Sequence, residues 1–248
     1  MSWVPRRRMI GVLGGMGPMA TIDFMAKIAA ATPAGLDQEH VPLIVHNVPQ
    51  IPDRSTAILQ GSDAPFLPML AGMRLLESSG VDLVAIPCNT AHFWYDRLAR
   101  SCGVEILHIA DAVSAVIAAS PWRVGSVVLL ATRGTIQAEI YQSRLRHLAD
   151  VIVPDERTQQ EVDEIIAGVK GGAIPDTQMR AAGLSARLLA DAQDALLLLA
   201  CTELPVAFAA APRQDRFIDA TKALAAQCVT ASLGAGNGSQ PTRKAGGR

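Results

Sequence analysis

Two cysteines in this sequence follow long apolar segments and are each followed by small polar residues. The segment "VDLVAIPCNTAHF", residues 81–93, leads from an apolar stretch into Cys88, and "DALLLLACTELP", residues 194–205, leads in the same way into Cys201. In open parallel sheets, the loops at the carboxyl ends of the strands form the ligand crevice. We therefore expect both thiols at strand ends and, if two sheets face each other, in one shared cleft.

Two thiols on opposite sides of one carbon atom suit a reaction that moves a proton from one face of that carbon to the other. Enantiomers have equal free energies, so their interconversion needs an acid and a base on opposite faces, with roles that exchange with direction. A thiol has a pKa of about 8.5, which neighbouring donors can lower towards neutrality. A free cysteine is more often a core residue, and we assign Cys102 and Cys228 to the core. The paired strand-end positions favour catalysis for Cys88 and Cys201.

Strands and helices are predicted to alternate along the chain. Short apolar segments, each followed by a segment of helical spacing, are typical of right-handed βαβ units with a parallel sheet. The expected strands are 8–13, 41–48, 81–86, 104–109, 127–130, 151–154 and 195–200, and the expected helices are 21–31, 66–79, 91–101, 136–148, 159–170 and 176–192.

The pattern restarts in the second half of the chain. Aligning Leu13 with Leu130 shifts the halves by 117 residues (130 − 13), and aligning Cys88 with Cys201 shifts them by 113 (201 − 88). A difference of four residues (117 − 113) is what loop trimming would produce. The chain is therefore predicted to contain two similar α/β domains, related by duplication or by a shared topology.

The domain boundaries follow from this repeat. We expect residues 1–110 and 213–233 to form the first domain, with Cys88, and residues 111–212 to form the second, with Cys201. The final segment, 234–248, is rich in Gly, Ser and Pro and lacks apolar periodicity. It is predicted to be a disordered tail.

Composition narrows the class of protein and its partners. Of 248 residues, 50% are hydrophobic and 18% are charged, which fits parallel strands covered on both faces. A net charge of −1 supplies no field for a phosphate backbone, so nucleic acid is not an expected partner. No apolar segment approaches the roughly 18 residues of a membrane helix, and no signal-peptide core is present, so we expect no membrane association and a cytoplasmic location. The four cysteines and five histidines lack metal-ligand spacing, which predicts reduced thiols and no structural metal.

Six motifs, in this order, resemble those of the cofactor-independent aspartate/glutamate racemase superfamily, most closely its aspartate racemase branch. They are "IGVLGGMGP", "PQIPDR", "PCNTAH", "LLATRGT", "GVKGG" and "ACTE", and they span about residues 8–232. The resemblance implies two pseudo-symmetric flavodoxin-like α/β/α domains with an active site in the cleft between them, and commonly a homodimer. It also implies amino-acid racemisation by two cysteines, without pyridoxal phosphate, metal or another cofactor. Cys88 matches the cysteine of the third motif and Cys201 that of the last.

An amino acid held between two thiols must also have its α-carboxylate fixed, so that the Cα proton points at a sulfur atom. Backbone N–H groups of "GGMGP", around Met16 and next to a predicted helix start, are suited to this task. The side chains of Asn89, Thr90, Thr135 and Thr202 are further candidates, and the family resemblance supports them. The alternative for each threonine is a helix N-cap, and the two roles are compatible.

A second carboxylate on the substrate calls for a cation, and two cations lie in the motifs. Arg54 in "IPDR" is suited to bind it bidentately and Lys170 in "GVKGG" adds a point charge, as the family resemblance also implies. The alternatives are an ion pair of Arg54 with Asp53 and a solvated Lys170 at a helix end. The two cations together favour aspartate over neutral amino acids as substrate.

Three further residues have no assigned role. His92 lies one helical turn after Cys88 and either tunes that thiol or packs inside the helix. Glu203 either orients Cys201 or raises its pKa by repulsion. Arg133 adds a cation to "LLATRGT", which either serves a different acidic substrate or points to solvent.

Other functions compete with a racemase. "GMGPMA", residues 15–20, fits the G-x-G-x-x-A fingerprint of dinucleotide-binding proteins, but no acid follows the second strand and Pro18 lies in the loop. A non-enzymatic two-domain ligand-binding protein is possible, but gives no reason for two matched thiols. The same scaffold could also racemise glutamate or other amino acids, or isomerise an unsaturated diacid between cis and trans forms.

Overall fold

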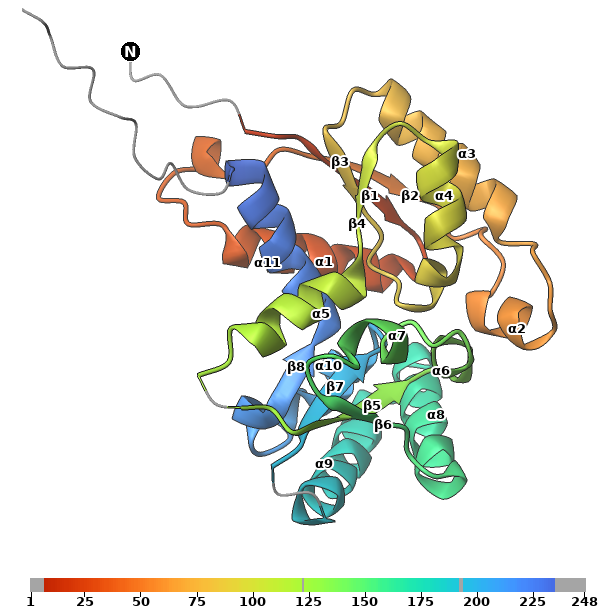
Figure 1. Cartoon of the computed structure of the whole chain (residues 1–248), viewed down its shortest axis with the longest axis vertical. Helices are drawn as coiled ribbons and strands as arrows, with labels where there is room; N and C mark the ends of the chain where they lie inside the picture. Colours follow the sequence, from red (N-terminus) through yellow and green to blue (C-terminus); the bar gives the residue numbers. More distant parts are fainter. Residues whose placement is uncertain (1–6, 122, 192–193, 235–248) are drawn as a thin grey trace, which may run out of the picture.

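The computed structural model describes residues 7–121, 123–191 and 194–234. In these residues two four-stranded sheets are formed, and every strand pair is parallel. The strand orders are β2-β1-β3-β4 and β6-β5-β7-β8, so the first strand of each sheet lies between the second and the third. The predicted α/β class, with two similar parallel sheets flanked by helices, is therefore confirmed (Figure 1).

The first sheet and its helices occupy the first half of the chain. The elements are β1 (Ile10–Gly14), α1 (Pro18–Ala31), η1 (Asp37–Glu39), β2 (Leu43–Asn47), α2 (Arg54–Leu59), α3 (Phe66–Ser78), β3 (Leu83–Ala85), η2 (Thr90–Trp94), α4 (Tyr95–Ser101), β4 (Glu105–Leu107) and α5 (Ile109–Ala118).

The second sheet repeats this arrangement. Its elements are β5 (Ser126–Ala131), α6 (Arg133–Gln137), α7 (Gln142–Leu145), β6 (Asp150–Ile152), α8 (Glu156–Lys170), α9 (Ile174–Asp191), β7 (Leu196–Ala200), α10 (Leu204–Ala207), η3 (Phe208–Ala210), η4 (Gln214–Arg216), β8 (Phe217–Asp219) and α11 (Ala220–Leu233).

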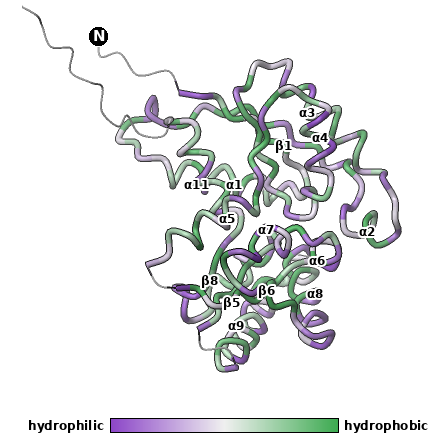
Figure 2. The backbone as a smooth tube through the Cα atoms, viewed as in Figure 1, coloured by the Kyte–Doolittle hydropathy of each residue, from purple (hydrophilic) through white to green (hydrophobic). Residues whose placement is uncertain are grey.

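The central strands β1, β3, β5 and β7 bury side chains on both faces of each sheet, since successive side chains along a strand point to opposite faces. Ile10 and Val12 of β1 pack on the side of α1, α5 and α11, whereas Leu13 packs on the side of α3 and α4. The second sheet likewise packs one face on α8 and α9. Figure 2 shows the hydrophilic residues mostly at the periphery, including much of α8.

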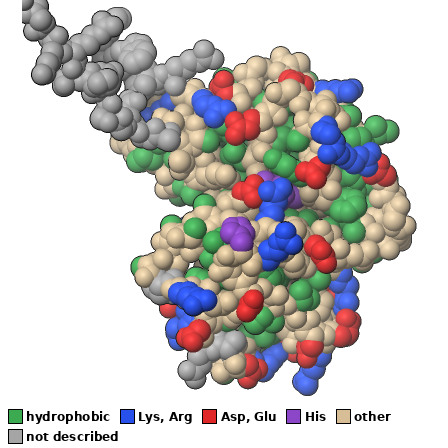
Figure 3. Space-filling view, in the orientation of Figure 1, with side chains coloured by type: hydrophobic (Ala, Val, Ile, Leu, Met, Phe, Trp, Pro, Cys, Tyr) green, Lys and Arg blue, Asp and Glu red, His purple; other side chains and the backbone are tan. Residues whose placement is uncertain are grey.

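One apolar layer is shared by the two sheets. Val127 and Leu129 of β5 belong to the same buried cluster as Ile10 and Val12 of β1, with side chains of α1, α5 and α11 between them. Figure 1 shows these three helices between the sheets. In the space-filling view the molecule is hollowed between two lobes, and acidic and basic side chains are interspersed over the face shown (Figure 3). The layer therefore connects the two lobes on the inside.

Lys27, whose side chain is largely buried, adds a polar link between the lobes. The ammonium group of Lys27 on α1 lies 2.7 Å from Asp219 at the end of β8 and 2.6 Å from Asp23. It also donates a hydrogen bond of 2.8 Å to Thr221 on α11. These contacts hold α1 against the last strand and helix of the chain.

The segment 213–233, expected in the first domain, is divided between two environments. β8, within this segment, pairs with β7 in the second sheet, whereas α11 packs between the sheets. A strand at the sheet edge pairs with the nearest exposed strand whatever domain its following helix covers. The predicted tail lies, apart from Gly234, outside the described residues.

The helix expected at 136–148 is wrong as a single element. The chain forms α6 and α7 instead, and between them Glu139 adopts a positive φ of 51°. A left-handed residue ends a helix, so apolar periodicity alone overestimates its length. The helix expected at 91–101 likewise begins as the 3-10 segment η2 before α4. The strand β8 and the helices α5 and α11 were missing from the expected elements.

We expect Gly15→Ala to destabilise the protein far more than Gly61→Ala. Both glycines have positive φ, of 93° and 65°, but a Cβ atom on Gly15 would lie 2.3 Å from backbone atoms of Val48, whereas one on Gly61 would meet nothing within 4 Å. Left-handed backbone alone costs an alanine about 1 to 2 kcal/mol, and a backbone clash adds about 1 to 3 kcal/mol or more. Urea denaturation followed by circular dichroism measures both losses. Equal losses would contradict the close approach of β1 to Val48.

Candidate active site

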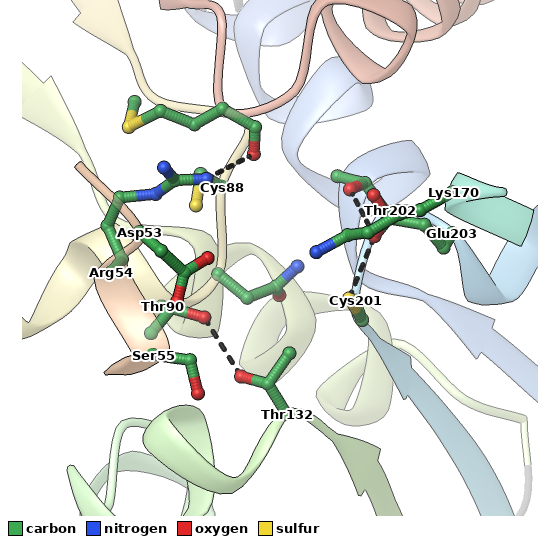
Figure 4. Close-up of a pocket in the computed structure, with 12 residues that line it drawn as sticks. Asp53, Arg54, Ser55, Cys88, Thr90, Thr132, Lys170, Cys201, Thr202 and Glu203 are labelled. Carbon is green, nitrogen blue, oxygen red and sulfur yellow. Dashed lines mark hydrogen bonds between the residues drawn. The ribbon is translucent and has the colours of Figure 1, made fainter. Parts of the chain in front are cut away.

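Both strand-end cysteines line one small cavity between the lobes. Its volume is about 40 Å³, and its wall consists of Met16, Asp53, Arg54, Ser55, Cys88, Asn89, Thr90, Thr132, Lys170, Cys201, Thr202 and Glu203. In Figure 4, Cys88 lies beside Arg54 on one side, and Cys201 lies with Lys170 and Glu203 on the other. Each cysteine is 7% exposed. The thiols are thus buried in packing except where they meet the cavity.

Equivalent strands carry the two thiols. Cys88 follows β3 and Cys201 follows β7, and each of these strands pairs with the first strand of its sheet, β1 and β5. The third strand in a 2-1-3-4 order ends near the centre of the carboxyl edge, where the chain reverses direction across the sheet. The repeat in the sequence therefore becomes a geometric repeat around the cavity.

Cys201 is held as a thiol by its neighbours. Its sulfur donates a hydrogen bond of 2.9 Å to the carboxylate of Glu203, which also accepts one of 2.9 Å from Thr202. Burial raises the pKa of Cys201 well above its usual range, the negative charge of Glu203 raises it further, and Lys170 lowers it. Glu203 thus both orients Cys201 and raises its pKa, so the two alternatives considered for it hold together.

Three threonine hydroxyls form a triangle across the interface of the lobes. Thr90 lies 3.0 Å from Thr132 and 2.9 Å from Thr135, and Thr132 and Thr135 are 3.0 Å apart. Thr135 is fully buried and is not part of the cavity wall, whereas Thr132 is. Thr135, expected to contact the substrate, therefore lies outside the wall and contacts Thr90 from behind, whereas Thr132 lines the cavity.

Asn89 presents an unpaired donor. Its side-chain oxygen accepts a hydrogen bond from Tyr141, but its buried Nδ2 atom has no hydrogen-bond partner among the described residues. In the "GGMGP" loop the backbone N–H of Gly15 donates to Thr21 (2.8 Å), so this N–H is not available to a ligand. Met16 lines the cavity, and its carbonyl accepts a hydrogen bond of 3.1 Å from Arg54.

Arg54 is positioned by backbone carbonyls. Besides Met16, its guanidinium donates to Ile51 (3.1 Å) and Pro52 (3.0 Å), while its buried Nε finds no acceptor in the described chain. Asp53 accepts instead from the backbone of Thr56 (2.7 Å) and so caps α2. Since no ion pair joins Asp53 and Arg54 where the structure describes the chain, the alternative of a local pair is not supported.

Lys170 is the last residue of α8. Figure 4 shows its ammonium group pointing into the cavity. No hydrogen bond or ion pair of this group is found in residues 7–121, 123–191 and 194–234. The cavity wall therefore carries one cation held by carbonyls and one without an anionic partner in that part of the chain, which makes the site suitable for an anion.

Two of the residues left open in the sequence lie away from the cavity wall. Arg133 forms ion pairs with Glu156 (2.6 Å) and Asp163 (2.7 Å) on the protein surface, and these carboxylates neutralise its charge. His92 is buried, its Nε2 atom lies 3.1 Å from the carbonyl of Ile86, and its ring packs 4.6 Å from that of His108. Burial lowers the pKa of His92 well below its usual range, so its ring is neutral and supports the loop before Cys88.

Sequence reasoning missed four residues of the site: Asp53, Ser55 and Thr132 in the wall and Tyr141 behind it. The first two flank Arg54 in the sequence, and Thr132 is the first threonine of "LLATRGT". Adjacency to a motif residue could have indicated these three. Nothing in the sequence near Tyr141 indicated its contact with Asn89, 52 residues away.

The remaining cysteines fit the core assignment: Cys228 is fully buried in the shared layer, and Cys102 packs against the cluster under α3 and α4. All four cysteines are free. Within the described residues no group of three or more His, Cys, Asp or Glu side chains could hold a metal ion. Nor does any helix there have the length and apolar character to cross a membrane.

The chain is similar to known racemases over most of its length. A broad specificity amino-acid racemase, RacX, of Bacillus subtilis is 30% identical over 234 residues, which cover 91% of this chain and 98% of the relative. The structure of the Picrophilus torridus aspartate racemase superposes with a TM-score of 0.75 at 32% identity, and covers 91% of this chain and 94% of its own.

The fold is also shared with more distant structures. An aspartate racemase homologue from Pyrococcus horikoshii superposes with a TM-score of 0.73 at 21% identity, over 91% of this chain and 99% of its own. The family model for Asp/Glu/Hydantoin racemases matches residues 13–228, which include both cysteines and all the cavity residues. The chain therefore belongs to the Asp/Glu/Hydantoin racemase family.

Proposed function

We propose that this protein interconverts L- and D-aspartate without a cofactor, by proton transfer between the substrate Cα and the thiols of Cys88 and Cys201. The observation that carries the proposal is that both thiols line one cavity together with Arg54 and Lys170. A thiol on each side of a bound carbon atom supplies the acid and the base that stereoinversion requires. The two cations supply partners for a second carboxylate.

In the proposed reaction, one cysteine as thiolate takes the Cα proton, and the electron pair of the C–H bond moves into the α-carboxylate. The opposite cysteine then donates its thiol proton to the other face of Cα and is left as the thiolate. Cys201, hydrogen-bonded to Glu203, begins as the proton donor in one direction. In the reverse direction Cys201 begins as the thiolate that the forward reaction leaves, which Lys170 favours, and takes the Cα proton, while the thiol of Cys88 donates its proton to the opposite face.

The charge that develops on the α-carboxylate requires donors already in place. The cavity offers the unpaired Nδ2 of Asn89 and the hydroxyls of Thr90, Thr132 and Thr202. The unpaired buried donors Asn89 Nδ2 and Arg54 Nε cost stability unless an acceptor binds there. A dicarboxylate amino acid would satisfy both, which is why we assign an acidic substrate.

Binding such a substrate requires the wall to move. A volume of about 40 Å³ holds only a few water molecules. The mobile candidates are the flexible side chains of Met16 and Lys170, since Lys170 has no partner within the described part of the chain. A homodimer and a cytoplasmic location remain predictions, which follow from the family resemblance and the sequence.

The substrate range is the main alternative within this proposal. The Picrophilus relative is named an aspartate racemase, and the Bacillus relative a broad specificity amino-acid racemase. Glutamate or other amino acids are therefore rival substrates, and cis-trans isomerisation of a diacid is a rival reaction. A non-enzymatic ligand-binding protein is the rival from another class.

We expect L- or D-aspartate, incubated with the enzyme in deuterated water without added cofactor, to exchange its Cα hydrogen and lose optical activity. Cys88→Ser and Cys201→Ser should each lower racemisation by about a hundredfold or more, because a hydroxyl is a far weaker acid–base group at neutral pH. Nuclear magnetic resonance follows exchange, and chiral chromatography follows inversion. Cys102→Ser is the matched control and should retain activity.

Other outcomes would select a rival. Exchange with glutamate or neutral amino acids but not with aspartate would replace aspartate as the proposed substrate. Saturable binding without exchange of any amino acid would favour a non-enzymatic ligand-binding protein. A fully active Cys88→Ser or Cys201→Ser variant would refute the two-thiol mechanism.

Removing the charge of Glu203 should make Cys201 more acidic. Burial raises the pKa of this thiol first and the Glu203 carboxylate raises it further, so Glu203→Gln is expected to lower the pKa. Alkylation by iodoacetamide over a pH series, with each cysteine followed by mass spectrometry, measures this change. The midpoint for Cys201 should move to lower pH in the variant. An unchanged midpoint at Cys201 would show that Glu203 does not control this thiol.

Lys170→Met is expected to raise KM for aspartate selectively. Loss of a hydrogen bond to a charged group costs about 1.5 to 3 kcal/mol, which is about tenfold or more in affinity. KM for a neutral amino acid, if one is turned over, should change little. Lys222→Met, which removes an exposed lysine outside the cavity wall, is the control. Equal effects on acidic and neutral substrates would argue against Lys170 as the partner of a side-chain carboxylate.

A further inference from the structure

Tyr141 is a fully buried tyrosine that reaches the site from the second half of the chain. Its ring belongs to the apolar layer shared by the two sheets. Its hydroxyl donates a hydrogen bond to the side-chain oxygen of Asn89, the residue after Cys88. Tyr141 does not line the cavity itself. It therefore acts on the site only through Asn89.

The backbone around Tyr141 explains how it reaches Asn89. Glu139 interrupts the helix with a φ of 51°, and the chain then turns Ile140 and Tyr141 inward, where they are 4% and 0% exposed. The carbonyl of Tyr141 accepts a hydrogen bond of 2.8 Å from Leu145, which anchors it to α7. The break thus places a rigid donor behind the cavity wall.

The orientation of the Asn89 amide decides what the cavity offers to a ligand. The oxygen and nitrogen ends of an asparagine side chain have nearly the same shape, and their hydrogen-bond partners determine which end faces which way. Asn89 lines the cavity, and with its oxygen held by Tyr141, which lies outside the cavity wall, its NH2 group is left without a partner among the described residues. The reverse orientation would place an oxygen against a substrate carboxylate, where like partial charges repel.

The phenol remains a donor throughout the pH range in which thiols titrate. Burial raises the pKa of Tyr141 well above its usual range, and negative charge on Asp219, Cys201 or Cys88 raises it further. A thiolate formed on either cysteine during turnover therefore raises the pKa of Tyr141 further, and the phenol keeps its proton.

We propose that Tyr141 is a positioning residue for catalysis, whose hydroxyl fixes the Asn89 amide so that its NH2 group binds the substrate α-carboxylate. The inference rests on the proposed function, in which Asn89 contacts that carboxylate. It also makes the active site depend on both halves of the chain beyond the two cysteines, because Tyr141 lies between α6 and α7 and Asn89 follows β3.

The test is a double-mutant cycle on kcat and KM for the amino acid that the wild-type enzyme racemises fastest. Tyr141→Phe should lower kcat/KM by about tenfold, the effect of losing one well-placed hydrogen bond around a charged group. A rise in KM should account for part of the loss, because the contact is made with bound substrate as well as in the transition state. In an Asn89→Ala background the same change should cost little, since the amide that it orients is gone.

The only other tyrosine of the chain provides the matched control. Tyr95 donates to the carbonyl of Ile106 (3.3 Å), away from the cavity, and Tyr95→Phe should leave kcat/KM unchanged. Thermal melts of all variants identify any that fail to fold. If Tyr141→Phe does not fold, Tyr141→Trp and Tyr141→His, which retain a ring donor, replace it in the cycle, and the recovery of kcat/KM by a ring donor is then the measured quantity.

Each result decides the inference. A folded Tyr141→Phe enzyme with unchanged kcat/KM overturns it, and so does an equal loss with and without Asn89, which would indicate a general structural effect. Failure of every ring-donor variant to restore kcat/KM also overturns it. A wild-type protein that exchanges no amino acid removes the proposed function, and this inference with it, whereas an active wild type with an unaffected Tyr141→Phe removes the inference alone.

Discussion

The site depends on one packing constraint: a single apolar layer joins the inner faces of both sheets. Side chains of α1, α5 and α11 belong to one buried cluster with β1 of the first sheet and β5 of the second. Because hydrophobic burial is dense and resists small displacements, this layer determines how the two carboxyl edges lie relative to each other. The cavity at those edges is therefore a product of core packing as well as of the residues that line it.

Some polar groups around the cavity have hydrogen-bond partners within the described residues, and others do not. The acids have internal partners: Asp53 caps α2, and Glu203 accepts from Cys201 and Thr202. Two donors of the wall, Nε of Arg54 and Nδ2 of Asn89, are buried and lack partners in the residues that the structure describes. A buried donor without an acceptor costs free energy. This loss of free energy arises at the wall of the cavity, where a bound anionic ligand would supply the missing acceptors.

A layer of polar contacts behind the wall holds these groups in place. The threonine triangle crosses between the lobes, the phenol of Tyr141 holds Asn89, and His92 supports the loop before Cys88. Each of these contacts is largely buried and joins segments that are distant along the chain or separated by a turn. Geometry at the thiols is thus maintained in part by Thr135, Tyr141 and His92, which do not line the cavity.

Much of this arrangement was determined by the sequence alone. Alternating apolar segments and helical spacing predict the parallel α/β class, because strands buried on both faces have few other solutions. The repeated strand-end cysteines predict a shared crevice, since parallel strands end at the same edge of a sheet. Arg54, Lys170, Asn89 and Thr202 were found as motif residues and lie in the wall with the thiols.

Only the tertiary structure decided which polar groups have partners. Periodicity does not reveal the helix break at Glu139, because this break depends on a backbone dihedral angle. Nor does it reveal the pairing of β8 with the second sheet or the ion pairs of Arg133 with Glu156 and Asp163, because these depend on neighbours far along the chain. For the same reason Thr132, rather than Thr135, reaches the cavity, and Tyr141 meets Asn89 across 52 residues. Residue types and strand ends are local properties, whereas hydrogen-bond partners are properties of the packed chain.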